Sequence, residues 1–410
     1  MSVDVTIRAI VELGEQQRLA EFIHARQGED AARLFASHLA QARYRSAFTR
    51  AAFANNALIG YALIRHERRR LGVATLEVGW LDDIYIPPDW RGRGAFRALL
   101  GDYLGVLVEH DFPFAMLHGP VKLYAPFGFA PYRFGAAALG EARSAETSAQ
   151  LRSATLADSD DLAALYAANY RDLPLTEVRA ATDWRWRFAQ GGKLEVLQDR
   201  QERVVAYAAV EQRLVRTKLR VVEAAAADAG VARVLITALL AQAYEQGLAH
   251  LYLALAPEHC VSQAALQMGG IVHVAAAPEQ GNRYGHADLA GIVRLSGALA
   301  MLTPELERRL ALSHYAGWSG TIQIELETGR IILTFQDGRV AISNDSRAFD
   351  LRLRKVKVPA LAQLCLGYRA PADLRATGDL DCDDTALSLF DVLFPVVMAC
   401  GENEDWWLEA

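Results

Sequence analysis

"IYIPPDWRGRGAFRALL" spans residues 84–100 and joins a β-branched run to a helical pattern through an Arg/Gly turn. A glycine-containing turn at the start of a helix exposes unpaired backbone N–H groups at the positive end of the helix dipole, which suits a phosphate. Gly92 and Gly94 remove side chains that would block the amides, and Arg91 and Arg93 can add charge-assisted contacts. The alternative for such a turn taken alone is a strand-to-helix connection with solvated arginines.

Composition indicates a folded globular protein. The chain has 410 residues, of which 52% are hydrophobic and 22% charged, enough for roughly two to four domains with cores of their own. A net charge of -6 gives no reason to expect nucleic acid or an anionic membrane as partner. The four cysteines are widely spaced, which predicts neither disulfides nor a metal site, and we expect reduced thiols in a cytoplasmic protein. We find no targeting segment and no apolar run long enough to span a membrane.

Apolar patterns divide the chain into three blocks: residues 1–150, 151–297 and 298–410. The first block predicts an α/β order, with strands over 56–67, 74–86 and 112–117 and a helix over 94–110. The second repeats this order, with strands near 203–211, 218–226 and 250–257 and a helix over 231–246. A degenerate duplication explains the repetition.

The third block has a different pattern. It predicts a helix over 303–315 and an antiparallel sheet with hairpin turns at Thr328-Gly329 and Asp337-Gly338. Two further helices are predicted over 359–366 and 385–397. This block is therefore expected to fold as a sheet covered by helices.

Two motifs resemble those of the GNAT acetyltransferases. The stretch 84–100 resembles their acetyl-CoA loop, R/Q-x-x-G-x-G/A, and LYAPFGF (123–129) resembles their later Tyr-x-x-F/L-G-F/Y signature. Together with a third block that resembles the sterol carrier protein fold, the two GNAT-like blocks are similar to the Eis (enhanced intracellular survival) family. Phe96 stands where single-domain GNATs usually have Gly or Ala, and this departure favours the Eis-like subfamily.

The resemblance implies acetyl-CoA as co-substrate and no metal. The residues expected to bind it are Ile84, Tyr85, Ile86, Arg91, Gly92, Arg93, Gly94, Ala95, Phe96, Arg97, Gly119 and Pro120. Backbone N–H groups alternate in direction along a strand, so the amides of Ile84 and Ile86 point to the same edge. In GNATs this edge is left unpaired and holds the pantetheine arm of the cofactor.

Acyl transfer to an amine requires an acid and a base, because an ammonium must lose a proton and the departing thiolate should gain one. Tyr124 matches the family's acid, and a packing role for its ring is the alternative. In the Eis family the chain's terminal carboxylate serves as base, which here would be Ala410, although the tail after the last predicted helix is longer than expected. Asp83 and His118 are the alternatives as base, while Asp82 and Glu77 are more simply solvated carboxylates.

The second block should be catalytically silent. Gly230 has no arginine pair before it, and Ala265 stands where the first block has Tyr124. HERRR (66–70) is interpreted as a solvated strand end and turn, and TDWRWRF (182–188) as a helix that buries one aromatic face.

The sequence thus predicts an N-acetyltransferase that acts on primary amines. The resemblance implies polycationic acceptors such as aminoglycosides, and a hexamer. Two alternatives stay open: a non-catalytic protein whose third block binds an apolar ligand, and a transferase that uses another acyl-CoA or acts on protein lysines.

Overall fold

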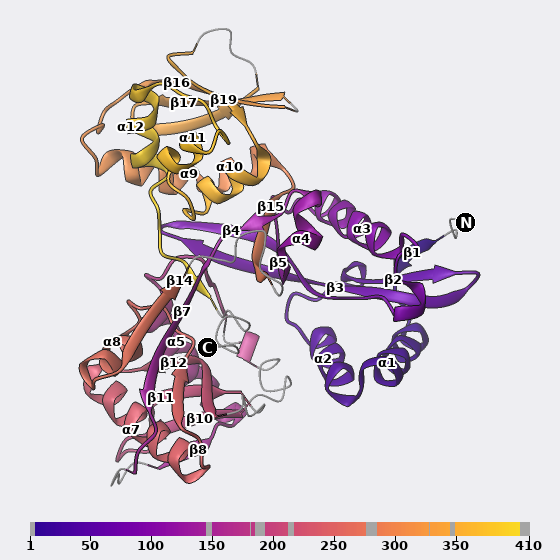
Figure 1. Ribbon diagram of the computed structural model, residues 1–410, viewed down its shortest axis with the longest axis vertical. Helices are drawn as coiled ribbons and strands as arrows, with labels where there is room; N and C mark the ends of the chain where they lie inside the picture. Colours follow the sequence, from indigo (N-terminus) through magenta and orange to yellow (C-terminus); the bar gives the residue numbers. More distant parts are fainter. Residues whose placement is uncertain are drawn as a thin grey trace. The chain divides into compact units, whose positions relative to one another are not determined.

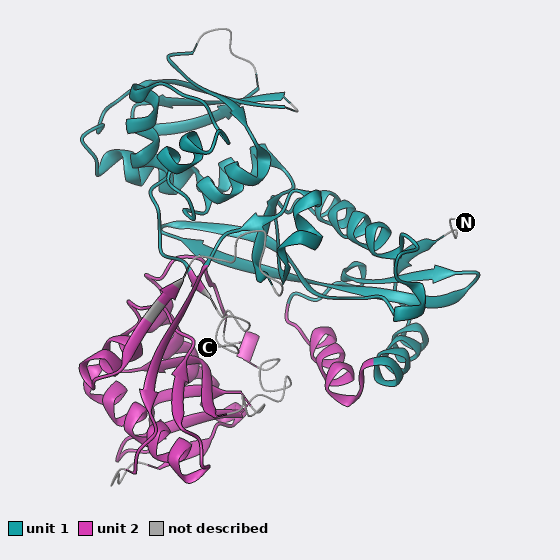
Figure 2. Cartoon of the chain, in the orientation of Figure 1, with its two compact units in different colours: residues 1–26, 43–133, 277–399 teal, residues 27–42, 134–276, 400–410 magenta. Residues whose placement is uncertain are grey.

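The computed structural model describes residues 5–144, 150–180, 182–184, 193–211, 217–275, 285–327, 329–344 and 349–401. The chain forms two compact units (Figures 1 and 2). Unit 1 comprises residues 1–26, 43–133 and 277–399, and unit 2 comprises residues 27–42, 134–276 and 400–410. These units cut the chain differently from the three blocks of the sequence, because the last part of the chain shares a unit with the first.

Unit 1 contains a mixed sheet in the order β1-β2-β3-β4-β5-β15-β6, in which β4 and β5 are parallel. Its elements are β1 (Thr6–Ala9), α1 (Leu13–Gln27), β2 (Thr49–Ala54), β3 (Ala57–Leu71), β4 (Ala74–Tyr85), α3 (Ala95–Glu109), β5 (Phe114–Pro120), α4 (Val121–Tyr124), β6 (Ala130–Pro131) and β15 (His286–Ile292). Helices α1 and α3 lie on opposite faces of the sheet (Figure 1). Leu99, Tyr103 and Leu107 recur at helical spacing and are fully buried, which fixes α3 against the sheet.

The rest of unit 1 is a four-stranded sheet, β18-β17-β16-β19, with helices packed on it. Its elements are α9 (Leu295–Ala311), β16 (Gly320–Leu326), β17 (Gly329–Gln336), β18 (Arg339–Ser343), β19 (Leu351–Val356), α10 (Val358–Cys365), α11 (Pro371–Ala376) and α12 (Asp384–Leu393). Hydrogen bonds join it to the first sheet: the Val73 amide donates to the Glu305 carboxylate (3.0 Å), the Glu77 amide to the Met301 sulfur (3.2 Å) and Gln363 Nε2 to the Pro131 carbonyl (3.0 Å).

Unit 2 repeats the architecture of the first sheet in the order β14-β7-β13-β12-β11-β10-β8, with β20 beside β7. Its elements are α2 (Glu29–Leu39), β7 (Phe134–Glu141), β8 (Leu151–Ser153), α5 (Ser159–Tyr170), β9 (Thr176–Glu177), β10 (Lys193–Gln198), β11 (Val204–Val210), β12 (Lys218–Ala226), α7 (Ala229–Glu245), β13 (His250–Leu253), α8 (Cys260–Gln267), β14 (Ile271–Ala275) and β20 (Cys400–Gly401). Trp184 is fully buried, as expected, and the remainder of the 182–188 motif lies outside the described residues.

Each large sheet takes one strand from the sequence of the other. Strand β7 lies in the first block but pairs with β13 and β14 in unit 2. Strand β15 lies in the second block but pairs with β5 and β6 in unit 1. The α/β fold class is confirmed, whereas no local pattern predicted this exchange. The predicted strands and helices occur with shifted bounds: the helix expected over 303–315 is α9 (Leu295–Ala311), and the strand expected over 250–257 is β13, which ends at Leu253.

Two predictions about local structure were wrong. The HERRR segment is no solvated turn, because β3 continues to Leu71 and pairs with β4 along that length. Arg69 and Glu67 are buried there and joined by a hydrogen bond of 2.8 Å. The last helix, α12, ends at Leu393 and not at Val397, before Pro395, which would remove a helical N–H donor.

Candidate active site

The Arg/Gly turn presents open backbone at the start of α3. Gly92 and Gly94 have positive φ angles of 73° and 89°, which glycine adopts without strain. Gly94 is the N-cap of α3, and a Cβ built on either glycine would meet no atom within 4 Å. The amides of the first turn of α3 are therefore accessible to an anion at the positive end of the helix dipole.

Three exposed arginines surround this turn. Arg91 Nε donates to the Ile86 carbonyl (3.2 Å), which ties the turn to the end of β4. The Arg93 guanidinium lies 5.2 Å from the centre of the Trp90 ring, and that of Arg97 lies 5.6 Å from the centre of the Phe127 ring. These aromatic contacts keep the cations near the turn.

Strands β4 and β5 separate next to this turn. Their parallel ladder runs from Val78 to Leu81 on β4 and stops there. The ladder between β3 and β4 has a bulge at the same point, where Asp82 is the extra residue. Beyond it, Ile84 and Tyr85 lie on a β4 edge that β5 does not pair, and an extended ligand could add to such an edge.

Tyr124 lies at the end of α4 and packs into the same core as Ile86 and Ala95. Its ring is 5.7 Å from that of Phe96, and Gly119 is required beneath it, because a Cβ there would lie 2.6 Å from the Tyr124 ring. Burial, followed by the negative charge of Asp83, raises the pKa of Tyr124 to about 12. The phenol is thus protonated at neutral pH and can donate a hydrogen bond.

On β4, burial is the main cause that raises the pKa of Asp83 above its ordinary value. Its Oδ2 accepts a hydrogen bond of 2.5 Å from Tyr61 Oη, which opposes that shift. Asp82 instead pairs with Arg65 (3.4 Å), and Glu77 pairs with His66. Sequence reasoning named Asp83 but missed Tyr61, because β-strand pairing alone brings the two together.

His118 belongs to an ion network on β5 and β15. Its Nδ1 donates to Asp288 (3.1 Å), whose other oxygen accepts from Arg133 (3.1 Å). Burial alone would raise the pKa of Asp288, but the hydrogen bond from His118 and the charge of Arg133 lower it. Asp288 was not predicted, because the strand that carries it comes from the second block.

The corresponding places in unit 2 are filled by the chain itself. The Asp228 carboxylate caps α7 by accepting from the Val231 amide (2.9 Å). Beyond the end of its ladder with β13, strand β12 forms hydrogen bonds with α5 instead. The Asn169 side chain donates to the Ala226 carbonyl and accepts from its amide, and the Tyr170 hydroxyl does the same with Ala224. Ala265, which aligns with Tyr124 in the sequence, is buried in the core.

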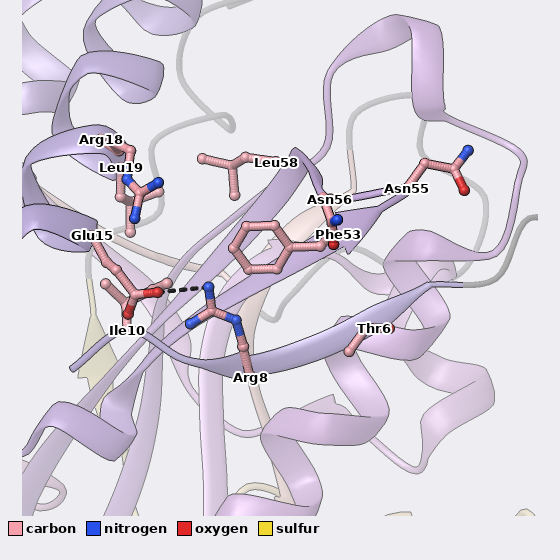
Figure 3. Close-up of a pocket in the computed structure, with 10 residues that line it drawn as sticks. All are labelled: Thr6, Arg8, Ile10, Glu15, Arg18, Leu19, Phe53, Asn55, Asn56 and Leu58. Atoms are coloured by element: carbon pink, nitrogen blue, oxygen red, sulfur yellow. Dashed lines mark ion pairs between the residues drawn. The ribbon is translucent and has the colours of Figure 1, made fainter. Parts of the chain in front are cut away.

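A cavity of about 660 Å³ opens elsewhere in unit 1, between β1, the start of α1 and the β2–β3 hairpin (Figure 3). Arg8 forms an ion pair with Glu15 (2.6 Å) and lies 4.6 Å from the centre of the Phe53 ring, and Arg18 Nε donates to the Gly14 carbonyl (3.4 Å). None of its lining residues belongs to the predicted site. We therefore assign no chemistry to this cavity.

Ala410, the predicted base, lies outside the described residues. Within the described ranges, no group of three or more His, Cys, Asp or Glu residues could hold a metal ion. The same part of the chain contains no helix with the length and apolarity that a membrane crossing requires.

Two family models match the chain. Residues 12–129 match the acetyltransferase (GNAT) family, and residues 323–399 match the sterol carrier protein domain. A search of curated proteins gives no match. The GNAT match contains the Arg/Gly turn and Tyr124.

Solved structures share the fold over nearly the whole chain. A conserved protein from Enterococcus faecalis V583 has a TM-score of 0.71 at 13% identity, covering 98% of this chain and 99% of its own. A GCN5-related N-acetyltransferase from Anabaena variabilis has a TM-score of 0.69 at 15% identity, covering 95% and 97%. Eis1 from Mycobacterium abscessus has a TM-score of 0.61 at 17% identity, covering 98% and 99%. The chain thus contains an acetyltransferase (GNAT) domain and a sterol carrier protein domain, and it shares the fold of Eis1 over nearly its whole length.

Proposed function

We propose that the chain transfers acetyl from acetyl-CoA to a primary amine by direct attack, with Tyr124 as general acid. The observation that carries this proposal is one juxtaposition in unit 1. An open glycine turn at the start of α3 lies beside the unpaired end of β4, and Tyr124 packs into the same core. A pyrophosphate, an extended thioester arm and a proton donor each have a place in this arrangement.

Tyr124 supplies the proton as the C–S bond breaks. With its pKa raised to about 12, the buried Tyr124 phenol is a weaker acid than a thiol, whose reference pKa is about 8.5, so complete proton transfer to the sulfur is unfavourable in the resting site. The hydrogen bond to the sulfur strengthens as charge develops on it, which stabilises the transition state more than the bound substrate.

Unit 2 is proposed to be non-catalytic. The Asp228 carboxylate occupies the start of α7, where an incoming phosphate would meet like charge. The side chains of Asn169 and Tyr170 accept hydrogen bonds from the backbone amides of β12 to which a pantetheine arm would bind. The duplicated unit therefore contributes structure and not a second reaction centre.

The resemblance to the Eis family supports polycationic acceptors, aminoglycosides or lysine side chains, and a cytoplasmic hexamer. These are proposals about the acceptor and the assembly, and they are independent of the acyl-transfer step. The molar mass in solution, measured by light scattering, tests the hexamer directly.

The experiment that tests the function measures thiol release from acetyl-CoA with a panel of amines. We expect release that depends on a primary amine and produces one acetamide per thiol, identified by mass spectrometry. Propionyl-CoA, butyryl-CoA and longer acyl-CoAs are run in parallel to define the acyl chain that is used. Amine-dependent release from a longer acyl-CoA alone would replace acetyl as the transferred group.

The same samples distinguish the other candidate function. If no acyl-CoA gives amine-dependent thiol release and calorimetry shows no acetyl-CoA binding, the proposal is wrong. The apolar-ligand role of the sterol carrier protein domain would then come first.

A further inference from the structure

The two large sheets carry the same irregularity at the same place. In unit 1 the parallel ladder of β4 ends at Leu81, and Asp82 is the bulged residue. In unit 2 the parallel ladder of β12 ends at Val221, and Val222 is the bulged residue. The residues that follow the bulges, Asp83 and Glu223, therefore occupy equivalent positions.

A tyrosine from the neighbouring strand bonds the carboxylate in both units. Tyr61 Oη donates to Asp83 Oδ2 (2.5 Å), and Tyr207 Oη donates to Glu223 Oε1 (2.9 Å). Both tyrosines are fully buried. The duplication thus preserves a tyrosine–carboxylate pair at the point where the strands separate.

The two pairs differ in charge. In unit 2, Arg179 donates to both oxygens of Glu223 (2.8 and 2.6 Å), and only 6% of its side chain and 10% of that of Glu223 are exposed. A buried ion pair with two parallel hydrogen bonds holds this carboxylate ionised and unable to exchange protons readily. In unit 2 the Glu223 carboxylate therefore has a structural role, as one half of a buried ion pair.

In unit 1 the carboxylate is not neutralised. Among the described residues no arginine or lysine forms an ion pair with Asp83, and the nearby Arg65 pairs with Asp82 and Glu67 instead. Burial, and to a smaller extent the charge of Asp82, raises the pKa of Asp83 above its ordinary value. A carboxylate in this state can take up a proton at less cost than a solvated one.

Building on the proposed acetyl transfer, we propose that Asp83 is the catalytic base, which accepts the proton of the acceptor ammonium, and that Tyr61 is its positioning residue. The proton moves from R–NH3⁺ to the Asp83 carboxylate, and the neutral amine then forms the C–N bond to the thioester carbon. The C–S bond breaks, Tyr124 gives its proton to the sulfur, and the second ammonium proton of the intermediate restores the phenol. Asp83 returns its proton to solvent, which balances the reaction.

Asp83 and Tyr124 are linked electrostatically. The charge of Asp83 is the second cause, after burial, of the raised pKa of Tyr124. Protonation of Asp83 removes that charge, so the phenol becomes a stronger acid at the stage when the sulfur needs a proton. The titratable and charged groups that face Asp83 are Tyr61, Asp82 and Tyr124.

The first test compares Asp83→Asn with Asp82→Asn. We expect Asp83→Asn to lower kcat by roughly 10²-fold, the lower end of the range for general base catalysis, with acetyl-CoA affinity unchanged. Asp82→Asn removes the adjacent carboxylate but keeps Asp83, the proposed base, so this variant should keep most of the turnover. The measurements are steady-state kinetics with one acceptor and calorimetry with acetyl-CoA.

The second test uses the pH profile of kcat/KM, with Tyr207→Phe as matched control for Tyr61→Phe. A base is active only when deprotonated, so wild-type activity should fall as pH decreases through the raised pKa of Asp83. The Tyr61 hydrogen bond opposes that raised pKa, so Tyr61→Phe should raise it further and move the acidic limb to higher pH. Tyr207→Phe removes the equivalent hydroxyl in unit 2 and should leave the limb in place, although both variants lose a buried hydrogen bond.

Three results would overturn the assignment. They are normal turnover of Asp83→Asn, an unchanged acidic limb in folded Tyr61→Phe, and loss of that limb on deletion of residues 408–410, which would make the Ala410 carboxylate the base. Failure of the underlying function looks different, because the wild-type chain would then show no amine-dependent thiol release at all.

Discussion

We expect Gly94→Asp to abolish acetyl-CoA binding while the protein stays folded. Gly94 caps α3 with φ of 89°, and a side chain there enters open space beside the amides of the first helical turn. Two unit charges of the same sign about 5 Å apart repel by about 3 kcal/mol at an effective dielectric constant of about 20. That energy corresponds to a loss of more than roughly 10²-fold in affinity, before the several charges of the pyrophosphate are counted.

Gly94→Asn is the matched control. Asparagine has almost the shape of aspartate, and both tolerate a positive φ better than other residues with side chains. Calorimetry with acetyl-CoA should therefore show binding by Gly94→Asn, weakened by the added volume, and none by Gly94→Asp. The melting temperatures of the two variants should agree. Wild-type affinity in Gly94→Asp would move the pyrophosphate away from this turn.

The signals that predicted this part of the site are local. The glycine spacing, the arginines and the helical periodicity after Gly94 all lie within one short stretch, and each has a backbone consequence that does not depend on the rest of the chain. The same holds for the hairpin turn Asp337-Gly338, whose positive φ angles of 51° and 74° match the prediction.

The strand exchange could not be predicted in this way. Strands β7 and β15 are apolar segments that fit either sheet by pattern, and only pairing across the whole chain decides their place. His118 and Asp288 are 170 positions apart, and their contact follows from that pairing. The His118–Asp288 pair therefore looks like solvated charges in the sequence, and so does the buried Arg69–Glu67 pair, whose burial the pattern of β3 alone does not reveal.

The acid–base groups are an intermediate case. Tyr124 is recognisable from its motif, whereas the role of Asp83 depends on a bulge, on Tyr61 from the adjacent strand and on the lack of an arginine partner in the described chain. The comparison with Glu223 and Arg179 needs both units, and the sequence repeat is too degenerate to align these residues. Local motifs thus predict the backbone that is proposed to bind the cofactor better than they predict the side chain that accepts the proton of the amine.

Tyr124→Phe should lower kcat by roughly 10² to 10⁴-fold with acetyl-CoA affinity preserved, because it removes only the proton donor. The ring packs against Phe96 and Phe129, and phenylalanine keeps these contacts. Since burial raises the pKa of Tyr124 to about 12, its ionisation should cause no loss of wild-type activity at neutral or mildly alkaline pH. Both properties are measured by steady-state kinetics over a pH series.

Tyr103→Phe separates this chemical role from the loss of a buried hydroxyl. Tyr103 is also buried in the core of unit 1, and its hydroxyl donates to the Gly79 carbonyl (2.7 Å), so its removal loses a buried hydrogen bond and lowers stability by about 1 kcal/mol. No hydrogen bond joins the Tyr124 hydroxyl to another described residue, so Tyr124→Phe should leave the melting temperature almost unchanged while turnover falls. The opposite pattern, a destabilised Tyr124→Phe with normal turnover, would assign the ring to packing alone and leave the thiolate to be protonated by water.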